Sequence, residues 1–203
     1  MIAIIDYGAG NLQSVYKALK HIQCDAFITK DTEKIRIADG AVLPGVGSFG
    51  DTIDSMVKLN IKNTVLDFIR SKKPFLGICL GLQLLFPGSE ESPGAHGLSV
   101  FNGQIKKIPQ KEGFKIPHMG WNSLNISKKE GLFKNIQNNP YVYFVHSYYL
   151  DAADKKMVSS TTNYSVPIDA SIHFENIIAT QFHPEKSGDI GIKMLQNFAD
   201  LVT

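Results

Sequence analysis

Cys79 lies in the segment Gly77–Gly81, directly after an apolar run and directly before a helical pattern. A glycine-flanked cysteine on a strand-to-helix turn is typical of a nucleophile elbow. The start of the following helix would favour the thiolate, and the Leu80 amide would face an acyl carbon bound to the sulfur. The pattern predicts a cysteine that forms an acyl-enzyme, with Leu80 as an oxyanion donor. The alternative is a buried structural cysteine between two packing glycines.

A base for this cysteine is predicted in His183-Pro184-Glu185. Proline biases His183 toward an extended conformation, in which residues i and i+2 point to the same side. Glu185 can then hold the imidazole in one tautomer, as the third member of a catalytic triad does. Two other histidines are rivals: His173, which also has a carboxylate two residues on, and His146, which interrupts an apolar strand.

A glycine-rich loop follows an earlier strand. Gly45, Gly47 and Gly50 match the dinucleotide-binding spacing, but the acid expected ~20 residues on should end the next strand, and Asp67 falls inside a helical pattern. We therefore expect no dinucleotide cofactor. The glycines of the Pro44–Gly50 loop could let a backbone amide reach the same reacting centre as a second oxyanion donor, the alternative being a plain tight turn. No histidine or cysteine pair has a familiar metal-ligand spacing, so no metal or other cofactor is expected.

Alternating strands and helices must position these residues in the first half of the chain. The expected strands are Ile2–Asp6, Ala26–Thr29, Ala41–Leu43 and Phe75–Ile78. The expected helices are Leu12–Ile22, Ile53–Leu59, Val65–Ile69 and Leu80–Phe86. Unbroken apolar strands that alternate with helices indicate a parallel sheet covered on both faces.

The second half changes character, because strand-like segments follow one another with polar turns between them. These segments are Leu98–Ile108, Trp121–Ile126, Tyr141–Leu150, Met157–Tyr164 and Ile172–Phe182, and a helix at Ile190–Leu201 closes the chain. Lys155-Lys156 and Glu175-Asn176 mark expected turns. With no linker or repeat, the sequence predicts a single α/β domain, 1–203, with an open, mostly parallel sheet flanked by helices and an antiparallel β extension.

Composition excludes several classes of protein. The 203 residues are 43% hydrophobic with a formal net charge of +2 and no block of like charges, which argues against a nucleic-acid binder. No apolar stretch approaches the ~20 residues that span a bilayer. The two cysteines, Cys24 and Cys79, are too few for a disulfide framework, and the N-terminal residues match a first strand better than a signal peptide. A reduced, cytoplasmic protein is expected.

Six ordered segments carry a resemblance to a known family. They are Asp6–Leu12, Pro44–Gly50, Gly77–Gln83, Ile116–Asn122, Tyr143–Tyr149 and Gln181–Ser187. The chain resembles the class I (triad) glutamine amidotransferases, and among them the glutaminase subunits of imidazole glycerol phosphate synthase. The resemblance implies hydrolysis of glutamine to glutamate and ammonia. Ammonia would pass to a cyclase subunit with a (β/α)₈-barrel fold, bound one-to-one as a heterodimer, during histidine biosynthesis.

The resemblance also implies residue roles. The catalytic residues would be Cys79 as nucleophile, His183 as base and acid, and Glu185 as orienter. Val46 and Gly47 match the oxyanion strand, and the positions near bound glutamine are Gln83, Ser147 and Tyr148. Asn11, Trp121 and Lys186 match positions facing the cyclase, although Trp121 could equally be a core residue. Pro87 and Ser99–Asn102 depart from the family pattern, which puts local loop structure in doubt.

Three other functions remain open at this point. The chain could be the glutaminase of a different synthase, against which the Trp121 and Lys186 segments argue. It could be a regulatory protein or a non-catalytic scaffold, against which the intact triad argues. It could also be an independent cysteine hydrolase of γ-glutamyl peptides, which would work at full speed without a partner.

Overall fold

A parallel sheet forms the first half of the chain. The computed structural model describes residues 1–202, and its first nine elements are β1 (Ile2–Ile5), α1 (Leu12–His21), β2 (Ala26–Thr29), α2 (Thr32–Ile37), β3 (Gly40–Gly45), α3 (Phe49–Lys58), α4 (Ile61–Arg70), β4 (Phe75–Cys79) and α5 (Leu80–Gln83). Strands β2, β1, β3 and β4 lie in that order and pair in parallel. The predicted open parallel sheet is confirmed.

The second half is mostly antiparallel. Its elements are β5 (Gly103–Lys107), β6 (His118–Ser123), β7 (Asn125–Ile126), the 3₁₀ turn Gly131–Phe133, β8 (Tyr141–His146), β9 (Tyr148–Ala152), the 3₁₀ turn Lys155–Met157, β10 (Val158–Tyr164), β11 (Val166–Phe174), β12 (Ile177–Thr180), the 3₁₀ turn Pro184–Lys186 and α6 (Gly188–Ala199). Strand β12 returns to pair in parallel with β4, and β11, β10 and β7 continue the sheet antiparallel beyond it.

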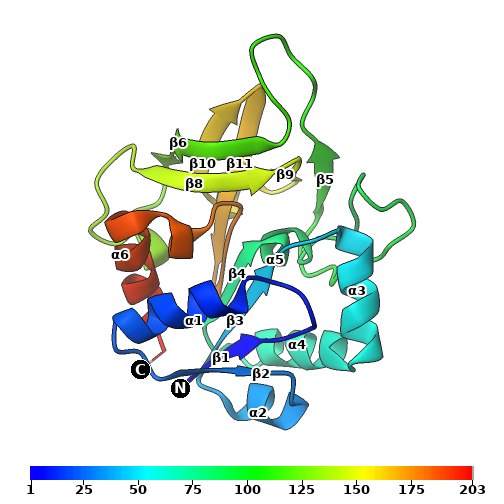
Figure 1. The fold of residues 1–203 in the computed structure, drawn as a ribbon, viewed down its shortest axis with the longest axis vertical. Coiled ribbons are helices and arrows are strands. Elements are labelled where there is room, and N and C mark those ends of the chain that lie inside the picture. Colours follow the sequence, from blue (N-terminus) through cyan, green and yellow to red (C-terminus); the bar gives the residue numbers. More distant parts are fainter. Residues whose placement is uncertain (203) are drawn as a thin grey trace.

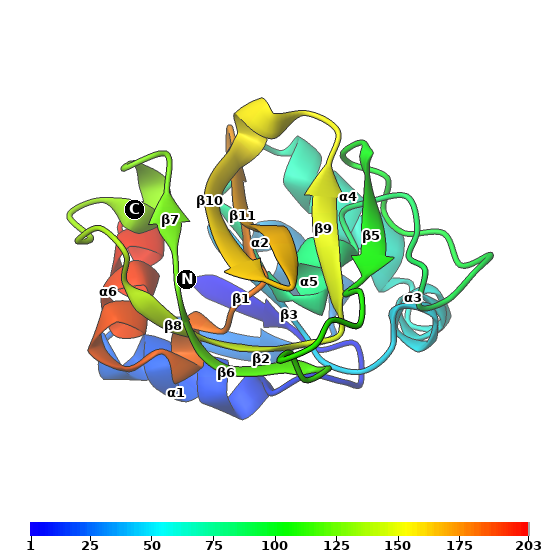
Figure 2. The same cartoon turned by 90° about the horizontal axis from the view of Figure 1, so that it is seen from above.

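Two strands stand apart from the large sheet. β6 and β8 pair antiparallel with each other to form a separate two-stranded ribbon. Figure 1 shows this ribbon in the upper part of the molecule, and Figure 2 shows the same two strands side by side from above. The cross-strand register alternates buried His118 and Phe144 on the inner face with Met119 and Trp121 on the outer face.

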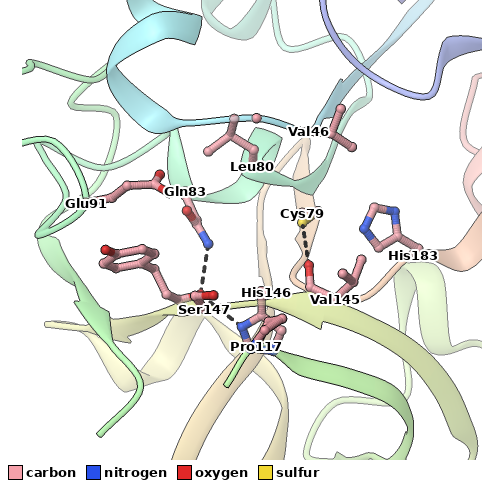
Figure 3. A pocket seen from close by; sticks show the side chains of 12 residues that line it. Val46, Cys79, Leu80, Gln83, Glu91, Pro117, Val145, His146, Ser147 and His183 are labelled. Atoms are coloured by element: carbon pink, nitrogen blue, oxygen red, sulfur yellow. Dashed lines mark hydrogen bonds between the residues drawn. The ribbon is translucent and has the colours of Figure 1, made fainter. Parts of the chain in front are cut away.

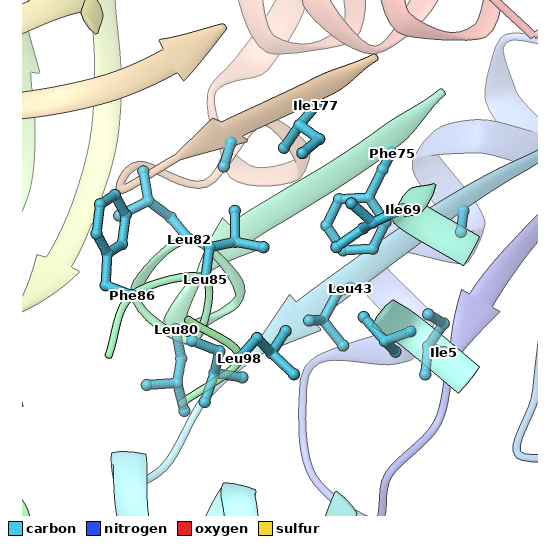
Figure 4. Close-up of a cluster of buried hydrophobic side chains, with 14 of the residues drawn as sticks. Ile5, Leu43, Ile69, Phe75, Leu80, Leu82, Leu85, Phe86, Leu98 and Ile177 are labelled. Carbon is cyan, nitrogen blue, oxygen red and sulfur yellow. The ribbon is translucent and has the colours of Figure 1, made fainter. Parts of the chain in front are cut away.

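Both faces of the parallel sheet are covered, as the unbroken apolar strands predict. Along β1, Ile2 and Ile4 pack in one buried cluster with Val15 of α1 and Leu195 of α6. The alternate β1 residues, Ala3 and Ile5, belong to a second cluster with side chains of α3, α4 and the turn after Cys79 (Figure 4). The period of two along each strand therefore decides which helices each side chain meets.

Helix α5 ends at Gln83 and is therefore shorter than the expected helix Leu80–Phe86. The carbonyls of Leu84 and Leu85 accept hydrogen bonds from the amides of Leu98 and Val100. Pro87 follows directly. These carbonyls bind the segment Leu98–Phe101 instead of a next helical turn. The predicted strand Leu98–Ile108 is therefore reduced to β5.

Three other predicted strands are each divided in two. Trp121–Ile126 contains the end of β6 and the whole of β7, which belong to different sheets. Tyr141–Leu150 separates at Ser147 into β8 and β9, which belong to different sheets. Ile172–Phe182 contains the end of β11 and the whole of β12, and the expected Glu175-Asn176 turn lies between them, with Glu175 at a φ of 51°. Helix α2 was not predicted; Asp31 caps it by accepting hydrogen bonds from the Glu33 and Lys34 amides.

Candidate active site

Three neighbouring parallel strands bring the candidate residues to one edge of the sheet. Gly45 at the end of β3 is the register partner of Cys79 at the end of β4, and Thr180 at the end of β12 is the partner of Ile78. The segments that follow these strands are the Val46–Gly47 loop, α5, and Gln181–His183. Binding sites of open α/β sheets lie at such carboxyl ends.

Cys79 occupies a strained elbow. Its φ of 57° and ψ of −107° are rare for a residue with a side chain, and they project the sulfur from the turn. The turn is compact because Gly81 lies against β3: a β-carbon on Gly81 would stand 2.0 Å from the Leu43 carbonyl oxygen. α5 has only four residues, so the helix-terminus contribution expected for the thiolate is small.

His183 and Glu185 form a buried pair. The Nδ1–H of His183 donates to Glu185 Oε1 at 2.7 Å, and both side chains are 2% exposed. The expectation of an extended chain holds only for His183, since Pro184–Lys186 form a 3₁₀ turn, and the carboxylate reaches the ring across this turn. With Nδ1 engaged, Nε2 has no hydrogen-bond partner among the described residues. Figure 3 shows the His183 ring beside the Cys79 sulfur.

Charge at the site favours an imidazolium. Burial lowers the pKa of His183, but the Cys79 sulfur beside it, the hydrogen bond to Glu185 and the negative charges of both residues outweigh burial and raise the pKa to about 10. His183 is therefore protonated at neutral pH in the resting site. A protonated imidazole beside a cysteine stabilises the thiolate, which is the form that attacks carbon.

A cavity of about 320 Å³ opens over the sulfur (Figure 3). The predicted residues that line it are Val46, Gly47, Cys79, Leu80, Gln83, Ser147, Tyr148 and His183, and the unpredicted ones are Glu91, Pro117, Val145 and His146. Glu91 belongs to an irregular loop with no sequence pattern that points to a site. Its carboxylate accepts a hydrogen bond from the Phe49 amide at 2.8 Å, which ties that loop to the start of α3.

The predicted partner-facing residues lie outside this cavity. Trp121 is exposed on β6, so the alternative of core packing is wrong for it. Its ring meets Tyr143 edge-on, with centroids 6.3 Å apart, and Lys186 Nζ stands 5.9 Å from the same Tyr143 ring. Asn11 is partly buried at the start of α1, and its side chain makes no capping hydrogen bond there.

Tyr7 lies behind the Val46–Gly47 loop and was not singled out by the sequence. It is fully buried, and its hydroxyl donates to the Pro44 carbonyl at 2.8 Å. Burial raises the pKa of Tyr7, and the negative charge of Cys79 raises it further. The hydroxyl therefore stays protonated and holds the strand end from which the loop departs.

The two rival histidines have other partners. His173 faces Glu130, and Glu175 pairs with Lys72 instead of with His173. His146 donates from Nδ1 to the Tyr148 carbonyl at 2.9 Å, so its Nε2 accepts from His118 Nδ1, also at 2.9 Å. Both ring nitrogens of His146 are occupied, and it is not free to act as the base for Cys79.

This buried histidine pair makes the fold sensitive to mild acid. Burial lowers the pKa of His118 to about 4 and that of His146 to about 3. Below pH 6.5 the unfolded chain binds two protons that the folded chain cannot, so stability falls as pH falls. Between pH 7.5 and 5.5, above the range of most carboxylates, the pair should lower the urea-unfolding free energy by about 3 kcal/mol, and His183, whose pKa is raised, should offset part of this loss.

Variants separate this effect from other titrations. His146→Gln should remove about half of the loss that the pair causes, while His21→Gln, on the exposed surface of α1, should leave the slope unchanged. If the pH dependence of stability were the same in His146→Gln as in the unmodified chain, the neutral pair would be contradicted.

Comparisons with known proteins agree with this geometry. The family model described as glutamine amidotransferase class-I matches residues 3–201. The chain is 48% identical over 202 residues to the imidazole glycerol phosphate synthase subunit HisH of Caldanaerobacter subterraneus subsp. tengcongensis, covering 100% of this chain and 98% of that one. It is also 48% identical over 203 residues to the HisH subunit of Methanothermobacter thermautotrophicus, covering 100% and 99%.

Solved structures share the fold at low sequence identity. One described as a glutamine amidotransferase superposes with a TM-score of 0.77 at 15% identity and covers 100% of this chain and 99% of its own. The structure of PurLQS from Thermotoga maritima superposes with a TM-score of 0.73 at 18% identity, covering 100% of this chain and 98% of the matched one. Within residues 1–202, no group of histidine, cysteine and acidic side chains could hold a metal ion, and no helix is long and apolar enough to cross a membrane.

Proposed function

Since the chain belongs to the class-I glutamine amidotransferase family, and within it to the HisH subunits, we propose that it is the glutaminase subunit of imidazole glycerol phosphate synthase. It hydrolyses glutamine to glutamate and ammonia for histidine biosynthesis. The observation that carries this proposal is Cys79 on a positive-φ elbow beside His183, whose Nδ1 is held by Glu185.

The reaction proceeds through a thioester in this proposal. The Cys79 thiolate attacks the γ-carboxamide carbon of glutamine, and the oxyanion accepts hydrogen bonds from the Leu80 amide and from the Val46–Gly47 loop. His183 gives its proton to the leaving nitrogen, and ammonia departs. His183 then takes a proton from water, which attacks the thioester carbon. Glutamate leaves, the sulfur is again a thiolate, and His183 is again protonated.

The cavity has groups suited to the amino-acid end of glutamine. Both hydrogens of the Gln83 amide are engaged, by the Tyr148 carbonyl and by Gln181 Oε1, so only its oxygen remains for a ligand. That oxygen and the Glu91 carboxylate are acceptors for the α-ammonium group. Ser147 and Tyr148, across the cavity, are proposed to bind the α-carboxylate.

We propose that the outer face of the β6–β8 ribbon docks the cyclase subunit. Met119, Trp121 and Tyr141 are 62%, 55% and 62% exposed on this face. Large exposed apolar side chains that gather on one face mark an interaction surface. Lys186 and Asn11 would extend the contact to a (β/α)₈-barrel partner in a one-to-one cytoplasmic heterodimer. β8 also reaches the cavity, because the Val145 carbonyl lies 3.9 Å from the Cys79 sulfur.

Docking can be followed by the fluorescence of Trp121, the only tryptophan of the chain. Met119→Glu would bury an unpaired charge in the interface, so the dissociation constant for the cyclase should rise by at least about 30-fold. Ile37→Glu is the matched control, since Ile37 is equally exposed on α2 at the opposite end of the molecule (Figure 1). Equal affinities for the two variants would exclude the ribbon as the docking face.

The function is tested by measuring glutamate production by the chain alone and then with the cyclase and its nucleotide ligand. We expect slow hydrolysis alone and strong stimulation in the complex, since an unregulated glutaminase would release ammonia to solvent. Equal, fast rates in both conditions would indicate an independent hydrolase. A folded chain that is inactive in both would indicate a scaffold or a different partner.

A further inference from the structure

Gln181 is a buried polar residue to which neither the family resemblance nor the mechanism above gives a role. It follows β12 directly, and because Thr180 pairs in register with Ile78, it stands beside Cys79 at the sheet edge. Its side chain is fully buried, and its backbone amide donates to the Ala170 carbonyl of β11 at 2.8 Å. Its Nε2 lies 3.6 Å from the Cys79 sulfur.

The orientation of the Gln181 amide follows from its neighbours. A backbone carbonyl can only accept, so the Gln83 amide must present its NH₂ group to the Tyr148 carbonyl, at 3.0 Å. The same NH₂ group lies 3.0 Å from the Gln181 side chain, which must therefore offer its oxygen. Gln181 is left with its own NH₂ group pointing at the sulfur. The NH₂ group of Gln83 donates to Gln181, and the NH₂ group of Gln181 donates in turn to the Cys79 sulfur.

The two hydrogen-bond contacts of the Cys79 sulfur favour opposite protonation states. The Val145 carbonyl, 3.9 Å away, can only accept and so favours a protonated thiol. The Gln181 N–H can only donate and so favours a thiolate. Neutral Gln181 keeps this preference whatever the protonation state of His183, which changes during turnover.

We propose that Gln181 is a catalytic residue that donates a hydrogen bond to the Cys79 sulfur and stabilises its negative charge. It does so in the resting thiolate and again when the sulfur leaves the acyl carbon as water cleaves the thioester. Gln83, through its bond to Gln181 Oε1, is the positioning residue for this donor. The inference deepens the proposed glutamine hydrolysis, because it concerns the same nucleophile.

The direct test is alkylation of Cys79 by iodoacetamide across pH 5 to 9, in a Cys24→Ser background, followed by mass spectrometry. Gln181→Met keeps the volume and removes the donor. The pH of half-maximal alkylation should rise by about one to two pH units, the effect of losing one hydrogen bond to a charged group. Gln181→Glu should shift it further, and Gln110→Met, an exposed glutamine in a loop, should not shift it.

An unchanged alkylation profile in folded Gln181→Met would overturn the proposal. If that variant does not fold, Gln83→Met serves instead: it leaves Gln181 in place without its orienting partner, so a smaller shift in the same direction is expected, and no shift would be equally fatal. This readout needs no glutamine, and its failure is therefore distinct from failure of the glutaminase assay.

Steady-state kinetics separate Gln181 from the substrate-binding residues. Gln181 is not among the residues that line the cavity. Gln181→Met should therefore lower kcat about 10-fold or more with little change in KM, whereas Gln83→Met should also raise KM. An effect of Gln181→Met confined to KM would contradict a role at the sulfur.

Discussion

Replacing Cys79 by alanine should reduce glutamine hydrolysis by about 10⁴-fold or more and leave the chain folded. The variant loses the atom that bonds to the substrate carbon, and no other nucleophile occupies the elbow. Alanine retains the β-carbon of cysteine, so the backbone strain at a φ of 57° is unchanged. The measurement is glutamate release in the presence of the cyclase and its ligand, where we expect the unmodified chain to be fastest.

Two controls accompany this variant. Cys24→Ser, at a partly buried cysteine remote from the cavity, should retain full activity. Urea unfolding of Cys79→Ala should remain cooperative, with a midpoint close to that of the unmodified chain. Turnover by folded Cys79→Ala within 10-fold of the unmodified rate would refute the thioester mechanism.

Gly81→Ala should produce a large loss of stability. The added β-carbon would stand 2.0 Å from the Leu43 oxygen and 3.1 Å from the Leu43 carbonyl carbon. Both are backbone atoms of β3, which is paired on both sides within the sheet and cannot move aside. Overpacking against a flexible side chain costs 1–3 kcal/mol, so a clash with sheet backbone should cost ~3 kcal/mol or more.

Gly88→Ala is the matched control for this substitution. Its added β-carbon would meet its nearest neighbour, the Ala95 carbonyl oxygen, at 3.4 Å, which is ordinary contact. The loss of urea-unfolding free energy should therefore be several-fold larger for Gly81→Ala than for Gly88→Ala. If Gly81→Ala were as stable as Gly88→Ala, the close approach of the elbow to β3 would be disproved.

The sequence predicts the parallel half of the fold well because its signals are local. Short apolar runs bounded by turn residues, such as Phe75–Ile78 after Pro74, are typical of buried strands, and the glycines around Cys79 mark the turn that follows. The pairing of His183 with Glu185 was also predictable, since they are two positions apart in the chain. The predicted backbone conformation was wrong, however, because a 3₁₀ turn, and not an extended chain, brings the Glu185 carboxylate to the His183 ring.

The features that the sequence did not reveal depend on long-range pairing. Gln181 meets Cys79 only because β12 inserts beside β4, and His118 meets His146 only because β6 pairs with β8. Glu91 reaches the cavity from a loop held by the Phe49 amide. Such contacts leave no signal in the periodicity or spacing of the sequence, because they join segments that are distant in the chain.

The insertion of β12 beside β4 has a consequence for how the protein is made. During translation β4 leaves the ribosome before β12 exists, so Phe75–Cys79 waits with one edge unpaired until Ile177–Thr180 arrives. About 100 residues separate the two strands, which at roughly 5–20 residues per second is a delay of about 5–20 s. The nascent chain therefore carries an exposed apolar edge, open to chaperones, and its cysteine lacks a general base until His183 has been synthesised.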